Sequence, residues 1–306
     1  MERQRSNRLR QLVFMLFLGV LAITPNVLGQ DEDGLNVLIV SAHPDDEAMY
    51  AAAIYRIAKE LSGNVDLAVI SDGSGGFRYS HLAESIYGLQ LTDERVARQY
   101  LPAIRKRELM AGGEVVGIRN YFFFDQLDHQ FTQNADTVLR HVWDADAVRR
   151  RLVEIMARVR YHFVFVHLPS PTVHGHHQAA SILALQAASE LATDRRPVVL
   201  ASLVGNKADT IPADLRTAPG YPIAVVMEDS PTFLFDREQP LDETGRLTYQ
   251  IVSNWLIAEH RSQGAMQLLV NQFDLERFWL FDANPPGALA AARALFDRLA
   301  APASEH

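Results

Sequence analysis

Short apolar runs alternate with longer stretches of helical pattern from about residue 35 to residue 205. The apolar runs, typical of strands, are residues 35–42, 65–71, 120–124, 161–167 and 197–204. Helical patterns lie between them, at residues 47–61, 93–117, 144–159 and 177–192. Because the runs are apolar throughout, we expect the strands to be covered on both faces. The alternation predicts an α/β fold, with a Rossmann-like, doubly wound, mostly parallel sheet.

The pattern becomes less regular after residue 205. Residues 206–246 have the composition of a loop, with candidate short strands in "YPIAVVM" and "TFLFD". A helical pattern at residues 248–263, the run "LERFWLF" and an Ala-rich helical pattern at residues 286–300 complete the chain. We expect this C-terminal extension to complete the wall of a site, within a single domain that spans residues 30–306.

Residues 1–29 have the layout of a secretory signal peptide. Four arginines precede an apolar stretch at residues 12–23, and Pro25 and small residues follow it. The pattern predicts cleavage after Gly29 and a secreted or periplasmic protein. A retained membrane anchor is the alternative, but the apolar stretch is shorter than the ~20 residues of a spanning helix.

Composition narrows the classes of ligand. The chain has no cysteine, so a metal ion would have to be bound by His, Asp or Glu side chains. Loss of residues 1–29 removes four arginines and one glutamate, which takes the net charge from −8 to −11. An acidic chain without basic runs after residue 10 argues against nucleic-acid binding and against stable membrane contact after cleavage.

Most of the dense polar chemistry follows the predicted strands. The segments after the first four strands are "HPDDE", "DGSGGF", "DQLDH" and "LPSPTVHGHH". In a doubly wound sheet, ligands bind beyond the carboxyl ends of the strands. We therefore expect these four segments to surround one site.

The first constellation is "HPDDE". His43 and Asp46 are three residues apart across a predicted strand-to-helix turn, so both can face one ion while Asp45 points elsewhere. Helix capping is the alternative, since acidic residues are favoured in a first turn. Capping explains the acids but not the histidine before them.

The second constellation is "HGHH", expected in a loop after the fourth strand. His174, His176 and His177 place three imidazoles within four residues. A solvated histidine cluster is the alternative, and the spacing does not decide which of the three binds metal. Two histidines and one carboxylate with open positions are typical of a catalytic zinc site. A further carboxylate can take a proton from the metal-bound water, and a further histidine can stabilise the oxyanion or protonate the leaving amine. Such a site suits hydrolysis of an amide.

Several segments together resemble the PIG-L/LmbE family of metal-dependent N-deacetylases. They are, in order, "LIVSAHPDDE", "SDGSGG", "RKRELMAGGEVVGIRNYFFFDQLD", "FVFVHLPSPTVHGHHQAA" and "AEHRSQ". The resemblance implies that His43, Asp46 and His177 bind the metal, which is usually Zn²⁺, with Fe²⁺ as an alternative. It also implies that Asp45 is the general base. His174 is implied to stabilise the tetrahedral intermediate and to assist departure of the amine.

This chain departs from the family pattern at one position of the second constellation. His176 stands where the family usually has an aspartate that tunes the preceding histidine. His176 is therefore a candidate substrate contact, together with Arg78 beyond "SDGSGG" and Asp128 in "DQLD". Turn capping explains Asp128 equally well, and His260 in "EHRSQ" is assigned a structural hydrogen bond in preference to a role in the site.

The resemblance and the predicted export together suggest a substrate class. We expect removal of an N-acyl group, most simply acetyl, from an amino sugar or glycan conjugate outside the cytoplasm. An amidase for another N-acyl conjugate and a non-catalytic glycan-binding protein on the same fold are the two alternatives.

Overall fold

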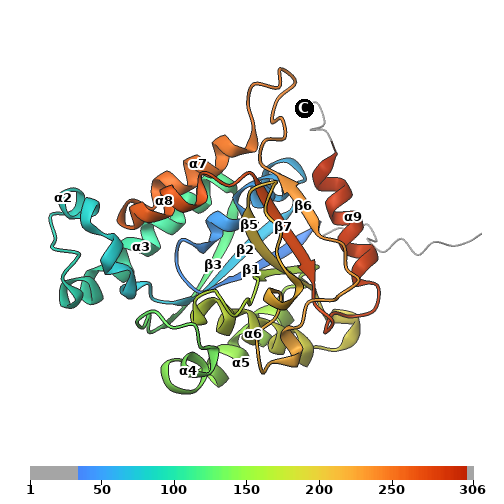
Figure 1. Ribbon diagram of the computed structural model, residues 1–306, viewed down its shortest axis with the longest axis horizontal. Coiled ribbons are helices and arrows are strands. Elements are labelled where there is room, and N and C mark those ends of the chain that lie inside the picture. The colour runs from blue at the N-terminus through green and yellow to red at the C-terminus, as the bar shows by residue number, and fades with distance from the viewer. Residues whose placement is uncertain (1–33, 302–306) are drawn as a thin grey trace, which may run out of the picture.

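A seven-stranded sheet forms the centre of the computed structural model, which describes residues 34–301 (Figure 1). The strands are β1 (Asn36–Ser41), β2 (Asn64–Ser71), β3 (Ile118–Gln126), β4 (Phe163–His167), β5 (Val198–Gly205), β6 (Phe233–Asp236) and β7 (Leu275–Leu280). Their order across the sheet is β3-β2-β1-β4-β5-β7-β6. The first five are parallel, and β7 is antiparallel to both of its neighbours. The predicted Rossmann-like, mostly parallel sheet is confirmed.

Helices cover both faces of the sheet (Figure 1). They are α1 (Ala51–Tyr55), α2 (Glu84–Tyr87), α3 (Glu94–Val116), α4 (Ala135–Thr137), α5 (Ala145–Arg158), α6 (Gly175–Glu190), α7 (Tyr249–Glu259), α8 (Gly264–Val270) and α9 (Ala288–Ala300). Alternate side chains of β1 enter two separate cores, since successive strand residues face opposite ways. Val37 and Ile39 pack with α1, α3, α7 and α9, whereas Leu38 and Val40 pack with α5 and α6. Burial on both faces explains why the strands are apolar throughout.

The order of the strands places β1 beside β4. The chain leaves β1 toward one face of the sheet and leaves β4 toward the other face. The segment after β1 packs in the core that contains α1, α3, α7 and α9. Helix α6, after β4, packs in the core that contains α5. This reversal is the switch point at which doubly wound sheets bind ligands. The histidines and acids after β1 and β4 therefore emerge side by side.

The C-terminal extension holds the first of these segments in place. Glu276 of β7 is fully buried and accepts hydrogen bonds from the backbone N–H groups of Ala52 (2.9 Å) and Ala53 (3.0 Å). Arg237 donates to the same carboxylate (2.9 Å) and to the carbonyl of Ala48 (2.8 Å). The start of α1, just after the "HPDDE" segment, is thus fixed by residues that are remote in sequence.

The structure corrects two local predictions. "YPIAVVM" is not a strand: Pro222–Ala224 form a 3-10 turn, because proline has no N–H to offer a strand ladder, and Val226 makes only an isolated bridge to Phe281. "HGHH" is not a loop, since His174 precedes α6 and the other two histidines lie in its first turn.

The predicted signal peptide, residues 1–29, lies outside the described residues. Within residues 34–301, no helix is both long enough and apolar enough to cross a membrane.

Candidate metal centre and active site

Three of the predicted ligands converge at the switch point. His43 Nδ1 lies 3.1 Å from His177 Nε2, which in turn lies 3.2 Å from Asp46 Oδ1. His43 Nδ1 lies 3.7 Å from the other carboxylate oxygen, Asp46 Oδ2. One ligand atom from each of the three side chains lies within 4.8 Å of the other two. Ligands at zinc bond lengths in a tetrahedral site are about 3.3 Å apart. The three side chains therefore fit one divalent ion, and the His43 and His177 side chains remain 13% and 21% exposed toward solvent.

The backbone fixes the Asp46 carboxylate in this position. Its Oδ2 accepts hydrogen bonds from the N–H groups of Ala42 (2.9 Å) and His43 (2.7 Å), which leaves Oδ1 toward His177. Although burial opposes the charged form, the imidazoles of His177, His167 and His43 hold the pKa of Asp46 well below its ordinary value. The carboxylate is therefore ionised, as a metal ligand must be.

The electrostatic environment of His43 favours a positive charge. Burial alone would lower the pKa of this imidazole, but the carboxylates of Asp128 and Asp46 outweigh it and raise the pKa to about 10. A cation held between these residues is stabilised by the same two carboxylates.

His174 and His176 lie on the far side of His43. The His174 ring stacks on Phe131 and on His43, with centroids 5.0 and 5.3 Å away. Burial and the neighbouring imidazoles lower the pKa of His174 to about 3, so its ring is neutral. His176 is completely buried against Trp143, at a centroid distance of 5.1 Å. A buried ring offers no surface to a substrate, which argues against the substrate contact expected for His176.

Asp45 does not join the ligands and is paired with an arginine. Arg105 of α3 lies 2.7 Å from Asp45 Oδ1 and 3.7 Å from Asp128 Oδ2, and all three side chains are buried. Arg105 also donates to the carbonyl of Gly73 (2.8 Å). Asp128, assigned to substrate from the sequence, is only 4% exposed and completes this network.

The glycines of "SDGSGG" allow side chains of the protein itself to approach. A Cβ on Gly75 would lie 2.8 Å from Asp128 Oδ1, and one on Gly76 would lie 2.6 Å from Gln263 Oε1. The segment forms a 3-10 helix, Ser74–Tyr79, and is not a free turn. Arg78 is exposed at its end, with its guanidinium 5.7 Å from the Phe77 ring, and does not meet the metal ligands.

The family comparison supports the resemblance seen in the sequence. Residues 38–188 match the sequence profile of the PIG-L family, described as GlcNAc-PI de-N-acetylase. The matched range contains both constellations. Residues 38–188, just under half of the chain, are similar to this family and are referred to as the PIG-L domain.

Individual relatives of the PIG-L domain are more distant. A probable N-acetyl-alpha-D-glucosaminyl L-malate deacetylase 2 of Bacillus cereus is 25% identical over 58% of this chain and 71% of its own length. The N,N'-diacetylchitobiose deacetylase of Pyrococcus horikoshii is 20% identical, with a TM-score of 0.39, over 52% of this chain and 51% of its own. A deacetylase of teicoplanin biosynthesis is 16% identical, with a TM-score of 0.49, over 80% of this chain and 96% of its own. Identities and TM-scores at this level do not indicate a function for this chain.

The PIG-L domain contains further site residues that the sequence reasoning missed. His167, the last residue of β4, is buried and stacks on His177 at a centroid distance of 4.3 Å. Burial lowers its pKa to about 3, so a neutral ring supports the ligand. Its position at the carboxyl end of a strand was the available signal, since the polar segment "LPSPTVHGHH" follows His167 directly.

The role of Glu47, the last residue of the "HPDDE" segment, also becomes clear. Its Oε1 lies 2.5 Å from His260 Nε2, and both side chains are completely buried. This pair joins the segment after β1 to the segment after α7, so the structural assignment of His260 agrees with its contacts.

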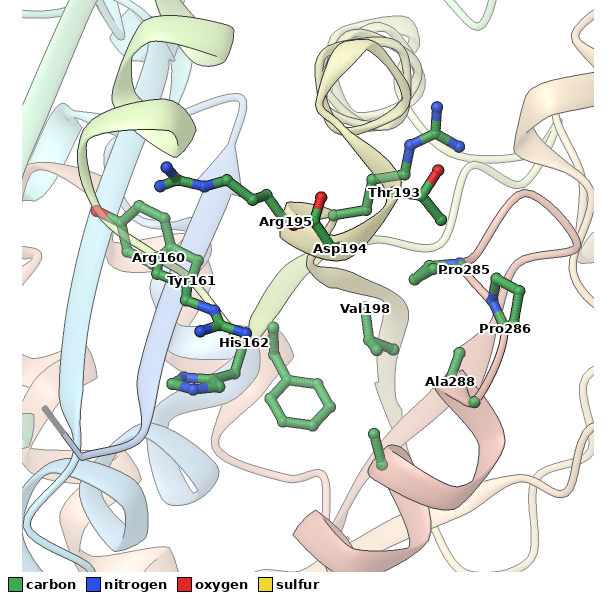
Figure 2. A pocket seen from close by; sticks show the side chains of 14 residues that line it. Arg160, Tyr161, His162, Thr193, Asp194, Arg195, Val198, Pro285, Pro286 and Ala288 are labelled. Carbon is green, nitrogen blue, oxygen red and sulfur yellow. The ribbon is translucent and has the colours of Figure 1, made fainter. Parts of the chain in front are cut away.

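One pocket of the described structure shares no lining residue with this site. It has a volume of about 260 Å³ and lies at the starts of β4 and β5, beside the N-terminus of α9 (Figure 2). Its lining includes Arg160, His162 and Arg195 but none of the predicted site residues. The candidate metal centre lies at the other end of the strands, beyond the carboxyl ends of β1 and β4.

Proposed function

We propose that this chain is a metal-dependent hydrolase that removes an N-acyl group, most simply acetyl, from an amino sugar or its conjugate. The observation that carries the proposal is the convergence of His43, Asp46 and His177 at tetrahedral ligand spacing within a PIG-L domain. The matched family is described as a GlcNAc-PI de-N-acetylase and the Bacillus cereus relative as a deacetylase of an N-acetylglucosaminyl malate, which supports this substrate class.

The proposed metal is zinc, with ferrous iron as the alternative. Two imidazoles and one carboxylate leave coordination positions open, which is the donor set of a catalytic zinc site. When bound there, such an ion lowers the pKa of water and polarises a carbonyl oxygen. The chain itself supplies ionised Asp46, fixed by two backbone N–H groups, and His177, supported by the stacked ring of His167.

Asp45 is the proposed general base. Arg105 holds its Oδ1 at 2.7 Å, which orients the buried carboxylate and stabilises its charge before a proton arrives. Abstraction of a proton from water by Asp45 weakens this ion pair but leaves Arg105 bound to the carbonyl of Gly73. Arg105 is thus a positioning residue for the base.

His174 is the proposed donor to the oxyanion. With its pKa lowered to about 3, it carries a single ring proton at neutral pH. Its buried Nε2 makes no hydrogen bond in the described structure and is free to donate to an oxygen that gains charge. The implied second task, delivery of a proton to the departing amine, falls more naturally to protonated Asp45.

Export remains part of the proposal on the pattern of residues 1–29 alone. An exported enzyme would act on cell-wall, exopolysaccharide or environmental glycans. N-terminal sequencing of the protein recovered from the periplasm or medium tests this, because cleavage gives a chain that begins near Gln30. A cell-bound chain that retains Met1 would contradict export without affecting the chemistry.

Acetate release is the direct test of the proposed reaction. The metal-loaded protein is incubated with N-acetylglucosamine, its oligomers and its glycosides, and with simple N-acyl amino acids as the comparison class. We expect release from the amino sugars. Release from the amino acids alone would favour the amidase alternative, and release from neither class would contradict the proposal.

A further inference from the structure

His43 has a similar set of partners at each of its two ring nitrogens. Nδ1 faces His177 and Asp46, the proposed ligands of the first ion. Nε2, on the opposite side of the ring, lies 3.0 Å from His176 Nδ1 and 3.6 Å from Asp128 Oδ1. Each nitrogen thus meets one imidazole and one carboxylate.

The three atoms on the Nε2 side have the spacing of ligands on one ion. The remaining edge, from His176 Nδ1 to Asp128 Oδ1, is 3.4 Å. The three distances between these ligand atoms, 3.0, 3.4 and 3.6 Å, bracket the separation of about 3.3 Å between ligand atoms in a tetrahedral zinc site. They are also close to the distances of 3.1 and 3.2 Å that His177 Nε2 makes to His43 Nδ1 and Asp46 Oδ1.

Hydrogen bonding explains this arrangement less well. A metal-binding histidine usually donates its second ring N–H to a carboxylate. Asp128 lies 3.6 Å from His43 Nε2 and 3.4 Å from His176 Nδ1, both longer than the 2.7–3.2 Å of an ordinary hydrogen bond. One proton between the two rings satisfies only those two nitrogens, whereas a cation satisfies all three atoms.

The surroundings suit a cation in the same place. Asp128 is buried, and its Oδ2 accepts a hydrogen bond from the N–H of Gly75 (3.0 Å) and faces Arg105 (3.7 Å), which leaves Oδ1 toward the two histidines. A third imidazole is close by, because His43, His174 and His176 can place one ligand atom each within 4.8 Å of one another.

We propose a second divalent-cation site formed by His43 Nε2, His176 Nδ1 and Asp128 Oδ1. It takes a zinc-like ion that prefers nitrogen and carboxylate ligands. His43 then bridges two ions through its two ring nitrogens, after its remaining ring proton leaves to solvent. The site depends on the histidine at position 176, where the family pattern usually has aspartate. The inference rests on the proposed first metal site but not on the deacylation reaction.

Metal counting tests the second site directly. The full chain is stripped with a chelator, titrated with Zn²⁺ alone, freed of unbound ion, and analysed for zinc per chain. We expect two ions in the wild type and one in His176→Phe, which keeps a ring against Trp143 but lacks ring nitrogens. Asp128→Asn is the second variant and is also expected to lose one ion. Arg78→Ala, an exposed arginine, is the matched control and should keep two.

A spectroscopic measurement tests the bridge. With Cu²⁺ in place of zinc, two ions joined by one imidazolate are magnetically coupled, so the spin-resonance signal of the wild type should be weaker than two isolated ions would give. His176→Phe should restore the full signal of one isolated Cu²⁺. One ion per chain in the saturated wild type overturns the second site alone, and no bound ion overturns both sites. Two ions in both His176→Phe and Asp128→Asn would also refute the assignment.

Discussion

The buried pair of Glu47 and His260 allows a quantitative prediction about stability. Both side chains are completely buried, and the contact joins Glu47 Oε1 to His260 Nε2. The other polar atoms, Glu47 Oε2 and His260 Nδ1, have no hydrogen-bond partner in the described structure. His260→Ala leaves the Glu47 carboxyl without its partner. Breaking a buried ion pair by removal of one member costs about 3–5 kcal/mol. Burial raises the pKa of Glu47, so the acid can take up a proton, and we expect the lower end of that range.

Urea unfolding at pH 7, followed by tryptophan fluorescence, measures this cost. We expect a loss of about 3 kcal/mol, a large part of the 5–15 kcal/mol typical of a domain. His81→Ala is the control, because the His81 side chain is 82% exposed and its removal should change stability by less than about 0.5 kcal/mol. A loss below about 1 kcal/mol in His260→Ala would refute the reasoning. A double-mutant cycle that combines His260→Ala with Glu47→Gln measures the interaction energy of the pair, and a value near zero would also refute the reasoning.

The same pair predicts a pH dependence. Burial opposes a charge on His260, but the Glu47 carboxylate outweighs it and raises the pKa of His260. The folded state then holds a proton more tightly than the unfolded chain, and the stability from this source is complete below the unfolded pKa of about 6.5. It is lost as the pH rises through the folded pKa. We expect His260→Gln to flatten the decrease in stability above pH 6.5, and an unchanged slope would contradict the assignment.

Three further substitutions test other contacts. Asp45→Asn should keep the zinc content of the wild type and lower the rate of acetate release by about 10²–10⁴, as removal of a general base does; full activity in the purified variant would contradict that role. Gly75→Ala places a Cβ 2.8 Å from Asp128 Oδ1 and should reduce the affinity for the second ion, measured by zinc titration. Asp66→Ala removes a fully buried carboxylate that accepts hydrogen bonds from Arg119 at 3.0 and 2.9 Å and should destabilise the fold by about 3 kcal/mol in urea unfolding.

Much of the fold could be predicted because the central strands are buried on both faces. Their apolar runs and the helical patterns between them fixed the type of sheet, and the polar segments after β1 and β4 located the candidate ligands. The "YPIAVVM" run was misleading because its apolar residues serve burial in a turn and an isolated bridge.

The contacts between distant segments could not be read in the same way. Arg105 and Arg107 are both arginines of α3, yet only Arg105 turns inward to reach Asp45, while Arg107 is exposed. His260 is 213 residues from Glu47, and no local pattern links them. His176 was a candidate substrate contact because it replaces the aspartate of the family pattern, whereas its burial against Trp143 depends on packing.

Chelation and reloading test the central claim most directly. The purified protein is assayed for acetate release from N-acetylglucosamine oligomers before chelation, after it, and after Zn²⁺ is returned, with His177→Ala treated in parallel. We predict that activity disappears with the metal and returns as the first equivalent of zinc binds, and that His177→Ala neither holds that ion nor recovers. Full activity in the metal-free protein, or in His177→Ala, would contradict the account.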